Sequence, residues 1–499
     1  SMTTRLCRLI LGVAAIGGLA ACTVGPDFLR PKAPEAQGYT PEPLPARTAA
    51  ARVGGGEAQR FVAGLDIPGQ WWTLFHSEPL NALIERALKA NPNIAAAQAA
   101  LRQSQELVYA QQGALFPTVG ANASATREKS SGAAFGIPGL SSIFSVSTAQ
   151  LSVAYAPDIF GGVRRAVESA EAQRDAERYQ LEATYLTLTS NVVTAAIQEA
   201  SLRAQIAATQ DIIDYENQQL VVLQHQFDLG GASKAAVLAQ AATLAQTRAT
   251  LPGLQKQLAQ TRNQLAALAG QLPSEAMAER FELSSLQLPA DLPVSLPSRL
   301  VEQRPDIRAA EAQLHAFSAQ IGVATARQLP QFSLTGSFGS VASPITNIFS
   351  PHTGVWSIGA GVTQTLFDAG TLLHQKRAAV AAFDQAAAQY RSTVLTAFQN
   401  VADALRAIQS DADALAAQVA SVQSAADSLE LSRQQFQLGA ITYLSLLTAE
   451  QTYQQARINL VQAQANRYAD TAALFQALGG GWWNRQDAVM TDNSDGFWP

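Results

Sequence analysis

The residue with the clearest chemistry in this chain is Cys22, which follows Leu19-Ala20-Ala21 at the end of a short apolar run. Arg5 and Arg8 precede the run, which is too short to cross about 30 Å of hydrocarbon as a helix. This layout is typical of an export signal, and small residues before a cysteine are what lipoprotein processing recognises. We therefore predict a signal peptide over residues 1–21 and lipidation of Cys22, with palmitate as an acyl chain. An ordinary signal with an incidental cysteine is the alternative.

The other cysteine, Cys7, would be removed with the signal, so we expect no disulfide in the mature chain. Thr23, rather than an aspartate, follows Cys22. The usual bacterial sorting rule sends such a lipoprotein to the outer membrane. We therefore expect a chain that is anchored there by lipid and extends into the periplasm.

The histidines show no metal-binding pattern. None has a partner His or Cys at the spacing of zinc ligands. We interpret them as solvated or packed side chains and expect no metal site. The five histidines are His76, His225, His315, His352 and His374.

Catalytic signatures are also missing from the sequence. It contains no Gly-x-Ser-x-Gly, no complete phosphate-binding loop and no dinucleotide fingerprint. The segment Gly230-Gly231-Ala232-Ser233-Lys234 resembles part of a phosphate loop, but it lies between two helical patterns instead of following a strand. A turn between helices is the better interpretation. We predict that the protein is not an enzyme and has no catalytic residues and no cofactor.

The composition favours long helices. The chain has 499 residues, 34 Lys and Arg against 39 Asp and Glu, a net charge of −5, and only 15% charged residues. Alanine and glutamine are abundant, which suits helices with small contact residues and uncharged polar outer faces. No cluster of Lys and Arg with interleaved aromatics appears, so we expect no nucleic-acid binding.

The sequence contains two copies of one unit. Asn91-Pro92-Asn93-Ile94 is echoed 213 residues later (304 − 91) by Arg304-Pro305-Asp306-Ile307. Phe227-Asp228-Leu229-Gly230 is echoed 209 residues later (436 − 227) by Phe436-Gln437-Leu438-Gly439. A duplication is the simplest account. The proline-rich stretch 272–298 is the linker between the copies.

Each copy changes its hydrophobic period in the same order. Helical segments at 94–115 and 306–329 are followed by runs of period two, first from Val119 to Ala125 and from Phe332 to Phe338. After a loop (129–142 or 342–352) a second alternating run follows, at 149–155 or 355–366. Each copy is therefore predicted to contribute one two-stranded hairpin.

Two very long helices come next. Residues 163–229 and 371–438 contain no Gly or Pro, so each could be a helix about 100 Å long. In the second, apolar residues step by four and three over 394–429, which predicts a coiled-coil seam. Return helices follow at 233–269, with a kink expected at Pro252-Gly253, and at 442–478. The seam residues are Val394, Phe398, Val401, Leu405, Ile408, Ala412, Leu415, Val419, Val422, Ala426 and Leu429.

Four amphipathic strands per chain are too few to close a barrel, and open strand edges cannot survive in lipid. Two copies would give eight strands, three would give twelve and four would give sixteen. An eight-stranded barrel is filled by its own side chains. We therefore predict a barrel closed by three copies. Four copies would also satisfy the strand count, and a small soluble sheet that forms no barrel is the other alternative.

Several further motifs stand along the chain: the lipobox, Val24-Gly25-Pro26-Asp27-Phe28, Arg30-Pro31, Trp71-Trp72 with Phe75, Arg304-Pro305-Asp306-Ile307, the segment 398–405 and the two Phe-x-Leu-Gly tips. Together they resemble those of the outer-membrane efflux factor family, the TolC-like exit ducts of tripartite pumps, and specifically its lipoprotein branch of OprM- and NodT-type proteins. The similarity covers essentially residues 22–480. It implies a mainly α fold with membrane β structure: a trimer whose twelve-stranded barrel continues into a periplasmic helical barrel, with a mixed equatorial domain.

The resemblance also implies a function for the helical tips. In the family, acidic residues beyond each tip glycine ring a periplasmic aperture; here those positions hold Ala236, Ser445 and Thr448, and the nearest acids are Asp228 and Glu450. The departure puts cation binding at the aperture in doubt. A periplasmic adaptor would dock on the tips. Simple capping of the helix ends is the alternative role for these residues, and the two roles are compatible. The tip residues are Leu229, Gly230, Gly231, Ala232, Leu438, Gly439, Ala440 and Ile441.

These expectations define the domain organisation as follows: signal peptide 1–21, lipid-anchored equatorial segment 22–80, first repeat 81–270, equatorial linker 271–298, second repeat 299–478 and equatorial tail 479–499. The expected function is a passive exit duct for drugs or toxic compounds. A periplasmic adaptor would open it, and an inner-membrane transporter of the RND type would power it. A type I protein-secretion duct and a non-pore coiled-coil spacer lipoprotein are the alternatives. The substrate cannot be read from a wide duct.

Overall fold

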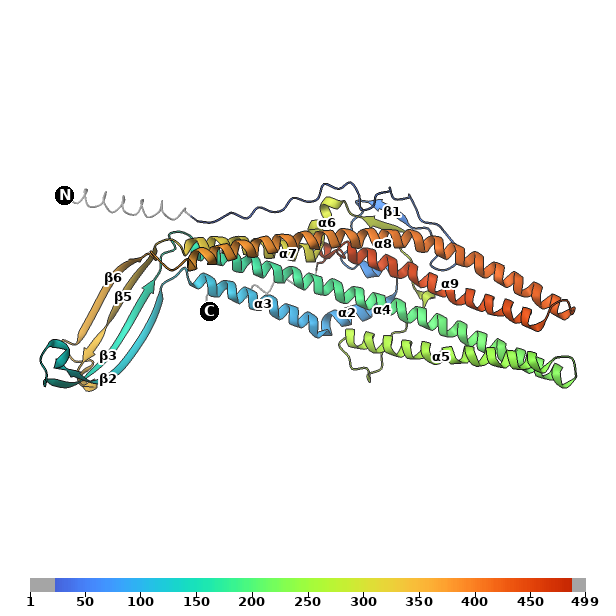
Figure 1. Cartoon of the computed structure of the whole chain (residues 1–499), viewed down its shortest axis with the longest axis horizontal. Helices are drawn as coiled ribbons and strands as arrows, with labels where there is room; N and C mark the ends of the chain where they lie inside the picture. The colour runs from blue at the N-terminus through green and yellow to red at the C-terminus, as the bar shows by residue number, and fades with distance from the viewer. Residues whose placement is uncertain (1–22, 487–499) are drawn as a thin grey trace.

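The computed structural model describes residues 23–486, so Cys7, Cys22 and the signal segment lie outside the described residues. The molecule is elongated, with a sheet at one end, a layer of long helices, and two helical hairpin tips at the opposite end (Figure 1). Short elements from the chain ends and the middle of the sequence pack against the centre of the helical layer (Figure 1).

The two halves of the chain have the same order of elements: a helix, two strands, a very long helix and a return helix. In the first half they are α3 (Pro92–Gly113), β2 (Thr118–Ser131), β3 (Ser141–Tyr155), α4 (Gly162–Asp228) and α5 (Lys234–Leu268). In the second half they are α7 (Pro305–Ala326), β5 (Gln331–Ala342), β6 (Gly354–Thr363), α8 (Thr371–Gln437) and α9 (Tyr443–Ala477).

The long helices begin at matching caps that the sequence analysis did not single out. Asp158 accepts hydrogen bonds from the amides of Val163 (2.9 Å) and Arg164 (2.8 Å) at the start of α4. Asp368 does the same for Gly370 (2.9 Å) and Leu372 (2.8 Å) at the start of α8. A carboxylate at this place satisfies free N–H groups and suits the positive end of the helix dipole. These amide donors hold the pKa of Asp368 below its usual value.

The predicted long helices are confirmed. Both α4 and α8 have 67 residues, about 100 Å at about 1.5 Å per residue. Along the α8 seam, the side chains of Val394, Val401, Leu405 and Leu415 are buried, whereas Phe398 is only partly buried. The return helix α5 continues through Pro252.

The short helices α3 and α7 meet the ends of the return helices. The Asn91 side chain accepts from the amide of Asn93 (2.8 Å) and donates to the carbonyl of Leu268 (2.9 Å), which joins the start of α3 to the end of α5. Arg304 joins the start of α7 to the end of α9 by donating to the carbonyl of Ala477 (3.1 Å). The chain therefore forms four helical rows, in the order α3/α5, α4, α7/α9 and α8.

The four longer strands form one antiparallel sheet in the order β2-β3-β5-β6. Both predicted hairpins are present, and β3 pairs with β5 to join them. The strand β3 begins at Ser141, eight residues before the predicted start at 149, which corrects the loop 129–142. Four of the seven residues 141–147 are serines, so this segment resembles a loop by composition, but it pairs with β2 as far as Ser131.

The sheet has two different faces. Because residues directly opposite on neighbouring strands point to the same side, the register places Leu151, Phe338 and Trp356 together on one face. Gln150, Ser337 and Ser357 lie on the other. The apolar face is exposed in the single chain: the exposed fraction is 53% for Leu151, 68% for Phe338 and 73% for Trp356. The same face includes Val119, Ala121, Ala123, Ala125, Val153, Leu334, Ile358 and Val362.

The central core lies where the remaining elements cover the helices. Trp71 is 1% exposed and stacks on Phe475 with ring centroids 5.6 Å apart, and Phe75 is fully buried beside them. The covering elements are β1 (Arg60–Ala63), α2 (Glu78–Ala90), β4 (Asp291–Val294), α6 (Pro297–Gln303) and the 3-10 helices Trp71–Phe75, Leu283–Ser285 and Trp482–Asn484. Two further 3-10 helices, Gly132–Phe135 and Ile345–Asn347, lie in the strand connections.

Within residues 23–486, none of the helices has a stretch that is long and apolar enough to cross a membrane.

Candidate functional site

Both hairpin tips are closed by the same backbone motif. Gly230 (φ +83°) and Gly439 (φ +74°) adopt the left-handed conformation that favours glycine. The Gly231 amide donates to the Gln226 carbonyl (2.8 Å) and the Ala440 amide to the Gln435 carbonyl (2.8 Å), which satisfies carbonyls that a helix end leaves free. The predicted tight tips are therefore confirmed.

Leucines project from the tips. The exposed fraction is 75% for Leu229 and 84% for Leu438, each directly before its tip glycine. Leu444, at the start of α9, is 62% exposed. Large apolar side chains with this exposure at the end of a molecule mark a surface that another protein could cover.

Behind the tips, the two hairpins pack against each other through a small apolar cluster. Leu223 of α4 and Val237 of α5 come from the first hairpin, and Leu429 of α8 and Leu446 of α9 from the second. All four are less than 5% exposed. The hairpins are therefore one packed unit in this chain rather than two independent arms.

A chain of hydrogen bonds joins the hairpins next to that cluster. Arg433 of α8 donates to the Tyr215 hydroxyl (2.6 Å), and this hydroxyl donates to Oε1 of Glu450 (2.8 Å). The Arg433 guanidinium also lies over the Tyr215 ring, 4.9 Å from its centroid. Three helices, α4, α8 and α9, are thus held by one polar contact group.

A second group completes the junction. Tyr443 of α9 donates to the side-chain carbonyl of Gln240 on α5, and the Gln240 amide donates to the backbone carbonyl of Glu216 (2.9 Å). Thr247 donates to Oε1 of Glu216 (3.0 Å). Gln240 and Glu216 are fully buried, so these bonds lie inside the packed hairpins.

The junction contains two buried carboxyl groups. Burial raises the pKa of Glu216, and burial together with the nearby Glu216 charge raises the pKa of Glu450. The second oxygen of each, Oε2, has no hydrogen-bond partner among the described residues. Burial therefore opposes the ionisation of both carboxyl groups, and the hydroxyls of Tyr215 and Thr247, which donate to them, offset part of this effect.

The proposed aperture residues take different positions. Ser445 and Thr448 are exposed on α9, where the Ser445 amide donates to the hydroxyl oxygen of the cap residue Thr442, and Asp228 is exposed at the end of α4. Ala236 is partly buried against the tip cluster. Glu450 is only 2% exposed, so its expected place as an aperture acid is corrected: it lies between the hairpins.

Sequence reasoning missed Tyr215, Glu216, Gln240, Arg433 and Tyr443. A signal for Glu216 was available, because it lies four residues after the buried Ile212 and three after the buried Ile213 on α4. A carboxyl group at a seam position requires a polar partner. The partners come from other helices, and their identity could not be read from spacing.

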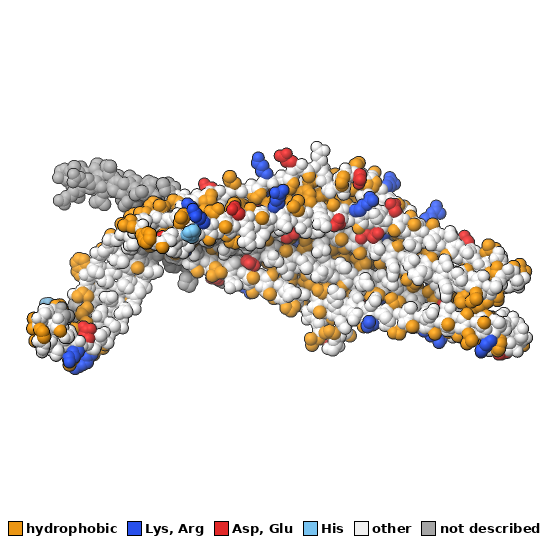
Figure 2. Space-filling model, viewed as in Figure 1, with side chains coloured by type: hydrophobic (Ala, Val, Ile, Leu, Met, Phe, Trp, Pro, Cys, Tyr) orange, Lys and Arg blue, Asp and Glu red, His pale blue; other side chains and the backbone are white. Residues whose placement is uncertain are grey.

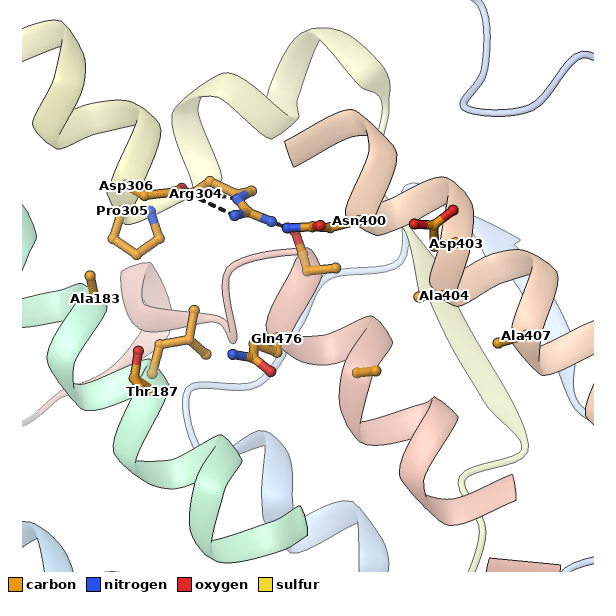
Figure 3. A pocket seen from close by; sticks show the side chains of 13 residues that line it. Ala183, Thr187, Arg304, Pro305, Asp306, Asn400, Asp403, Ala404, Ala407 and Gln476 are labelled. Carbon is orange, nitrogen blue, oxygen red and sulfur yellow. Dashed lines mark hydrogen bonds and ion pairs between the residues drawn. The ribbon is translucent and has the colours of Figure 1, made fainter. Parts of the chain in front are cut away.

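A cavity of about 510 Å³ lies where α7 and α9 meet between α4 and α8 (Figure 3). Arg304 lines it and donates to both Asp306 oxygens (3.0 and 2.6 Å) as well as to Ala477. The Arg304-Pro305-Asp306 motif thus joins two helix ends. Ala183, Ala404 and Ala407 supply apolar lining, and Thr187 and Gln476 supply polar lining. No metal-binding cluster occurs in the described part of the chain.

A pH dependence is expected from Asp470, on α9. Burial and the neighbouring Asp411 carboxyl raise its pKa from 3.8 to about 8, although Arg467 opposes the shift. The folded chain therefore holds a proton that the unfolded chain releases near pH 3.8, so stability falls as the pH rises from about 4 to about 8. In thermal melts across this range, Asp470→Asn should flatten the fall, whereas Asp413→Asn, at an exposed position of α8, should not. An unchanged slope in Asp470→Asn would contradict the assignment.

The comparison with known proteins now decides the family. The profile described as "outer membrane efflux protein" matches residues 83–271 and 296–480. This chain belongs to that family. As a member it is an outer-membrane exit duct for efflux, and such channels are not enzymes.

Individual relatives agree over most of the length of this efflux protein. It is 29% identical to the probable efflux pump outer membrane protein TtgC of Pseudomonas putida strain KT2440, over 98% of this chain and 99% of TtgC. It is 32% identical to the pyoverdine export outer membrane protein OpmQ of Pseudomonas aeruginosa, over 83% and 87%. The solved outer-membrane channel OprN has 28% identity and a TM-score of 0.82, covering 92% of this chain and all of that one.

A second solved structure is the open state of the Neisseria gonorrhoeae MtrE channel. It has 26% identity and a TM-score of 0.78, covering 93% of this efflux protein and all of the MtrE chain. The sheet, the long helices and the tips described above therefore belong to a channel fold.

Proposed function

We propose that three copies of this chain close their sheets into a twelve-stranded barrel that continues into a helical duct about 100 Å long. The observation that carries the proposal is the two-faced sheet with its unpaired outer edges, β2 and β6. Strand edges exposed to lipid leave backbone groups without partners, at a cost of several kcal/mol each. Pairing β2 of one copy with β6 of the next removes both edges.

The two faces determine the direction of closure. Leu151, Phe338 and Trp356 would face lipid, and Gln150, Ser337 and Ser357 would line the water-filled lumen. A spacer lipoprotein without a pore has no use for such a sheet. The matching order of elements in the two halves supports a duplication, with repeats at 81–270 and 299–478 and the equatorial parts 22–80, 271–298 and 479–499 between and around them.

The experiment that tests the duct is single-channel recording of the purified full-length protein in planar lipid bilayers. The proposal expects discrete conductance steps from a species that migrates as a trimer and falls to a monomer on heating. A protein that binds the bilayer as a folded monomer and never conducts would favour the spacer.

The exported compounds belong to the class of small toxic molecules and antibiotics, driven by an inner-membrane transporter of the RND type. Relatives with nearly the same sequence identity to this chain, 28–32%, are named for different cargo: antibiotics, toluene, pyoverdine and cations. Such varied cargo fits a passive duct in which selection occurs in the transporter. A periplasmic adaptor would cover the exposed tip leucines, Leu229 and Leu438, and draw the hairpins apart.

The contact group behind the tips fits a closing device. Separation of the hairpins would break the bonds from Arg433 to Tyr215 and from Tyr215 to Glu450, and water would then solvate the two buried carboxyl groups. Charged hydrogen bonds are the stronger kind in proteins, but the carboxyl desolvation offsets part of their contribution. The closed form is therefore held by contacts that an adaptor can replace.

Lipidation of Cys22 is supported by the position of its neighbours. The Val24 amide donates to the Phe160 carbonyl (3.0 Å), and Arg165 donates to the Val24 carbonyl (3.1 Å) and to Asp27 (2.7 Å). Thr23 packs against Gly161, where an added Cβ would lie 2.8 Å from it. These contacts hold the chain next to residue 22 at the junction of strands and helices, at the inner face of the membrane.

Cys22→Ser is expected to abolish labelling with a radioactive fatty acid and to slow removal of the signal. The trimer should remain in the outer-membrane fraction, because twelve strands hold it more strongly than one lipidated residue. Thr23→Ser should leave labelling intact. Loss of all membrane association in Cys22→Ser would contradict the barrel.

Thr448→Asp tests the aperture. Three-fold symmetry would bring three copies of the exposed Thr448 side chain near the axis, so the change creates a ring of three carboxylates whose repulsion divalent cations relieve. Bilayer conductance should then be blocked by divalent cations from the periplasmic side, with little block in the wild type or in Thr448→Lys. Unaltered ion selectivity with a lowered melting temperature in both variants would place Thr448 between helices instead.

A further inference from the structure

Charged residues are confined to one place in the membrane sheet. Across residues 118–155 and 331–363, which cover the four strands and their connections, the only Lys, Arg, Asp and Glu are Arg127, Glu128 and Lys129. They lie near the end of β2 that is farthest from the helices. Figure 2 shows blue and red side chains together at that far tip of the sheet.

The two cations point to the apolar face. Arg127 pairs with Ser145 and Lys129 with Ile143, and both continue the alternation of Val119, Ala121, Ala123 and Ala125 on β2. The Glu128 side chain, between them on the strand, lies on the polar face. Arg127 and Lys129 are exposed, and neither has an ion-pair partner within the part of the chain that the structure describes.

Their height matches a membrane boundary. From Val119 to Lys129 the strand advances ten residues, roughly 33 Å at about 3.3 Å per residue, or roughly 25 Å in height at a tilt of about 40°. An outer-membrane apolar band is about 25 Å tall. The cations therefore lie at the outer edge of the band, where a charge on the lipid side costs little, rather than at its centre.

A hollow with mixed polar and apolar walls lies beside Arg127. It has a volume of about 550 Å³. Arg127, Ser145, Ser147 and Ser343 supply its polar side chains, and Ile143, Phe144 and Ile345 are among its apolar ones. Two cations two residues apart on one face, next to a hollow with serine side chains, offer the donors that recognise phosphate.

We propose that Arg127 and Lys129 bind the phosphorylated headgroup of an outer-leaflet lipid at the outer rim of the barrel. The inference rests on the proposed barrel, because it needs the apolar face to be in contact with lipid. Arg127 supplies a planar fork for phosphate oxygens, and Lys129 adds a second positive charge about 7 Å along the strand. The acyl chains of the same lipid lie along the Ala and Val positions below the cations.

The test compares two lipids on the purified full-length trimer in a mild non-ionic detergent. The probes are bisphosphorylated lipid A and the same lipid after enzymatic removal of both phosphates. The variant is Arg127→Gln/Lys129→Gln. The matched control is Arg248→Gln/Lys256→Gln, which removes two exposed cations from α5. Bound lipid is measured by native mass spectrometry and by titration at low and high salt.

The wild type and the control should prefer the phosphorylated lipid, and the Arg127→Gln/Lys129→Gln variant should bind it about 30-fold more weakly at low salt, with the preference shrinking as salt rises. Equal binding by variant and wild type, or no preference for phosphate in the wild type, would overturn the inference. Displacement of the lipid by inorganic pyrophosphate at an equal concentration would also overturn the inference, because the site would then bind free phosphate groups and not a lipid headgroup.

Single-channel conductance of the same samples separates this inference from the proposed duct. A variant that conducts as the wild type does, but has lost the phosphate preference, supports the site. A wild type that forms no conducting trimer would refute the duct itself. Arg127→Lys/Lys129→Arg keeps both charges and should restore most of the preference.

Discussion

Leu151→Arg is expected to abolish the heat-sensitive trimer and its insertion into the outer membrane. Leu151 lies between Ala121 and Phe338 on the apolar face, in the lower half of the strand. An arginine on a lipid-facing surface costs about 2–4 kcal/mol at the midplane and about 0–1 kcal/mol near the interface, so at the depth of Leu151 we expect about 1–2 kcal/mol per site, hence roughly 3–6 kcal/mol for three copies in one barrel. Trimer yield in membrane fractions and the temperature of trimer dissociation measure the effect.

The matched control is Gln150→Arg, one residue away on the opposite face. A side chain in a water-filled lumen keeps its solvation, so this variant should assemble normally and only change the ion selectivity. The two substitutions add the same charge to the same strand. Greater damage from Gln150→Arg would mean that the faces are assigned the wrong way round, and equal tolerance of both would mean that the Leu151 face is not in contact with lipid.

Leu405→Ala is expected to lower the stability of the helical layer by about 2–5 kcal/mol. Leu405 has no exposed surface and belongs to the central core, in which α8 packs against the equatorial residues. The neighbouring Arg406 is exposed on the same helix, so Arg406→Ala is the control and should change little. Thermal melting of both variants tests the seam: equal melting temperatures would reject this register.

The long helices were predictable because their signal is local and sustained. A segment of 67 residues without Gly or Pro leaves no place for a break, and Gly230 and Gly439 end the helices by a conformation that only glycine adopts easily. The alternating strands were predictable for the same reason where Val119, Leu334 and Phe338 supply strong alternation.

The corrected features depend on partners far away in the sequence. The start of β3 at Ser141 is determined by pairing with Ser131, and serine carries no strong preference of its own. Glu450 is placed by Tyr215, 235 residues earlier, and its helix position alone does not distinguish an aperture from a junction. Residue spacing predicts which face of a helix a side chain lies on, whereas the segment that packs against that face is determined by the tertiary structure.

The closure of the sheet by three copies is tested most directly by cross-linking its two edges. Ser124→Cys on β2 and Gly359→Cys on β6 both lie on the polar face, and a short bifunctional thiol reagent can join them only between copies. Asn122→Cys and Thr126→Cys, each paired with Gly359→Cys, test two other registers between β2 of one copy and β6 of the next. In native outer membranes the account predicts dimers and then trimers on a denaturing gel, with no larger product. A ladder that continues to four or more copies, or chains that stay monomeric with every pair, would contradict the twelve-stranded barrel.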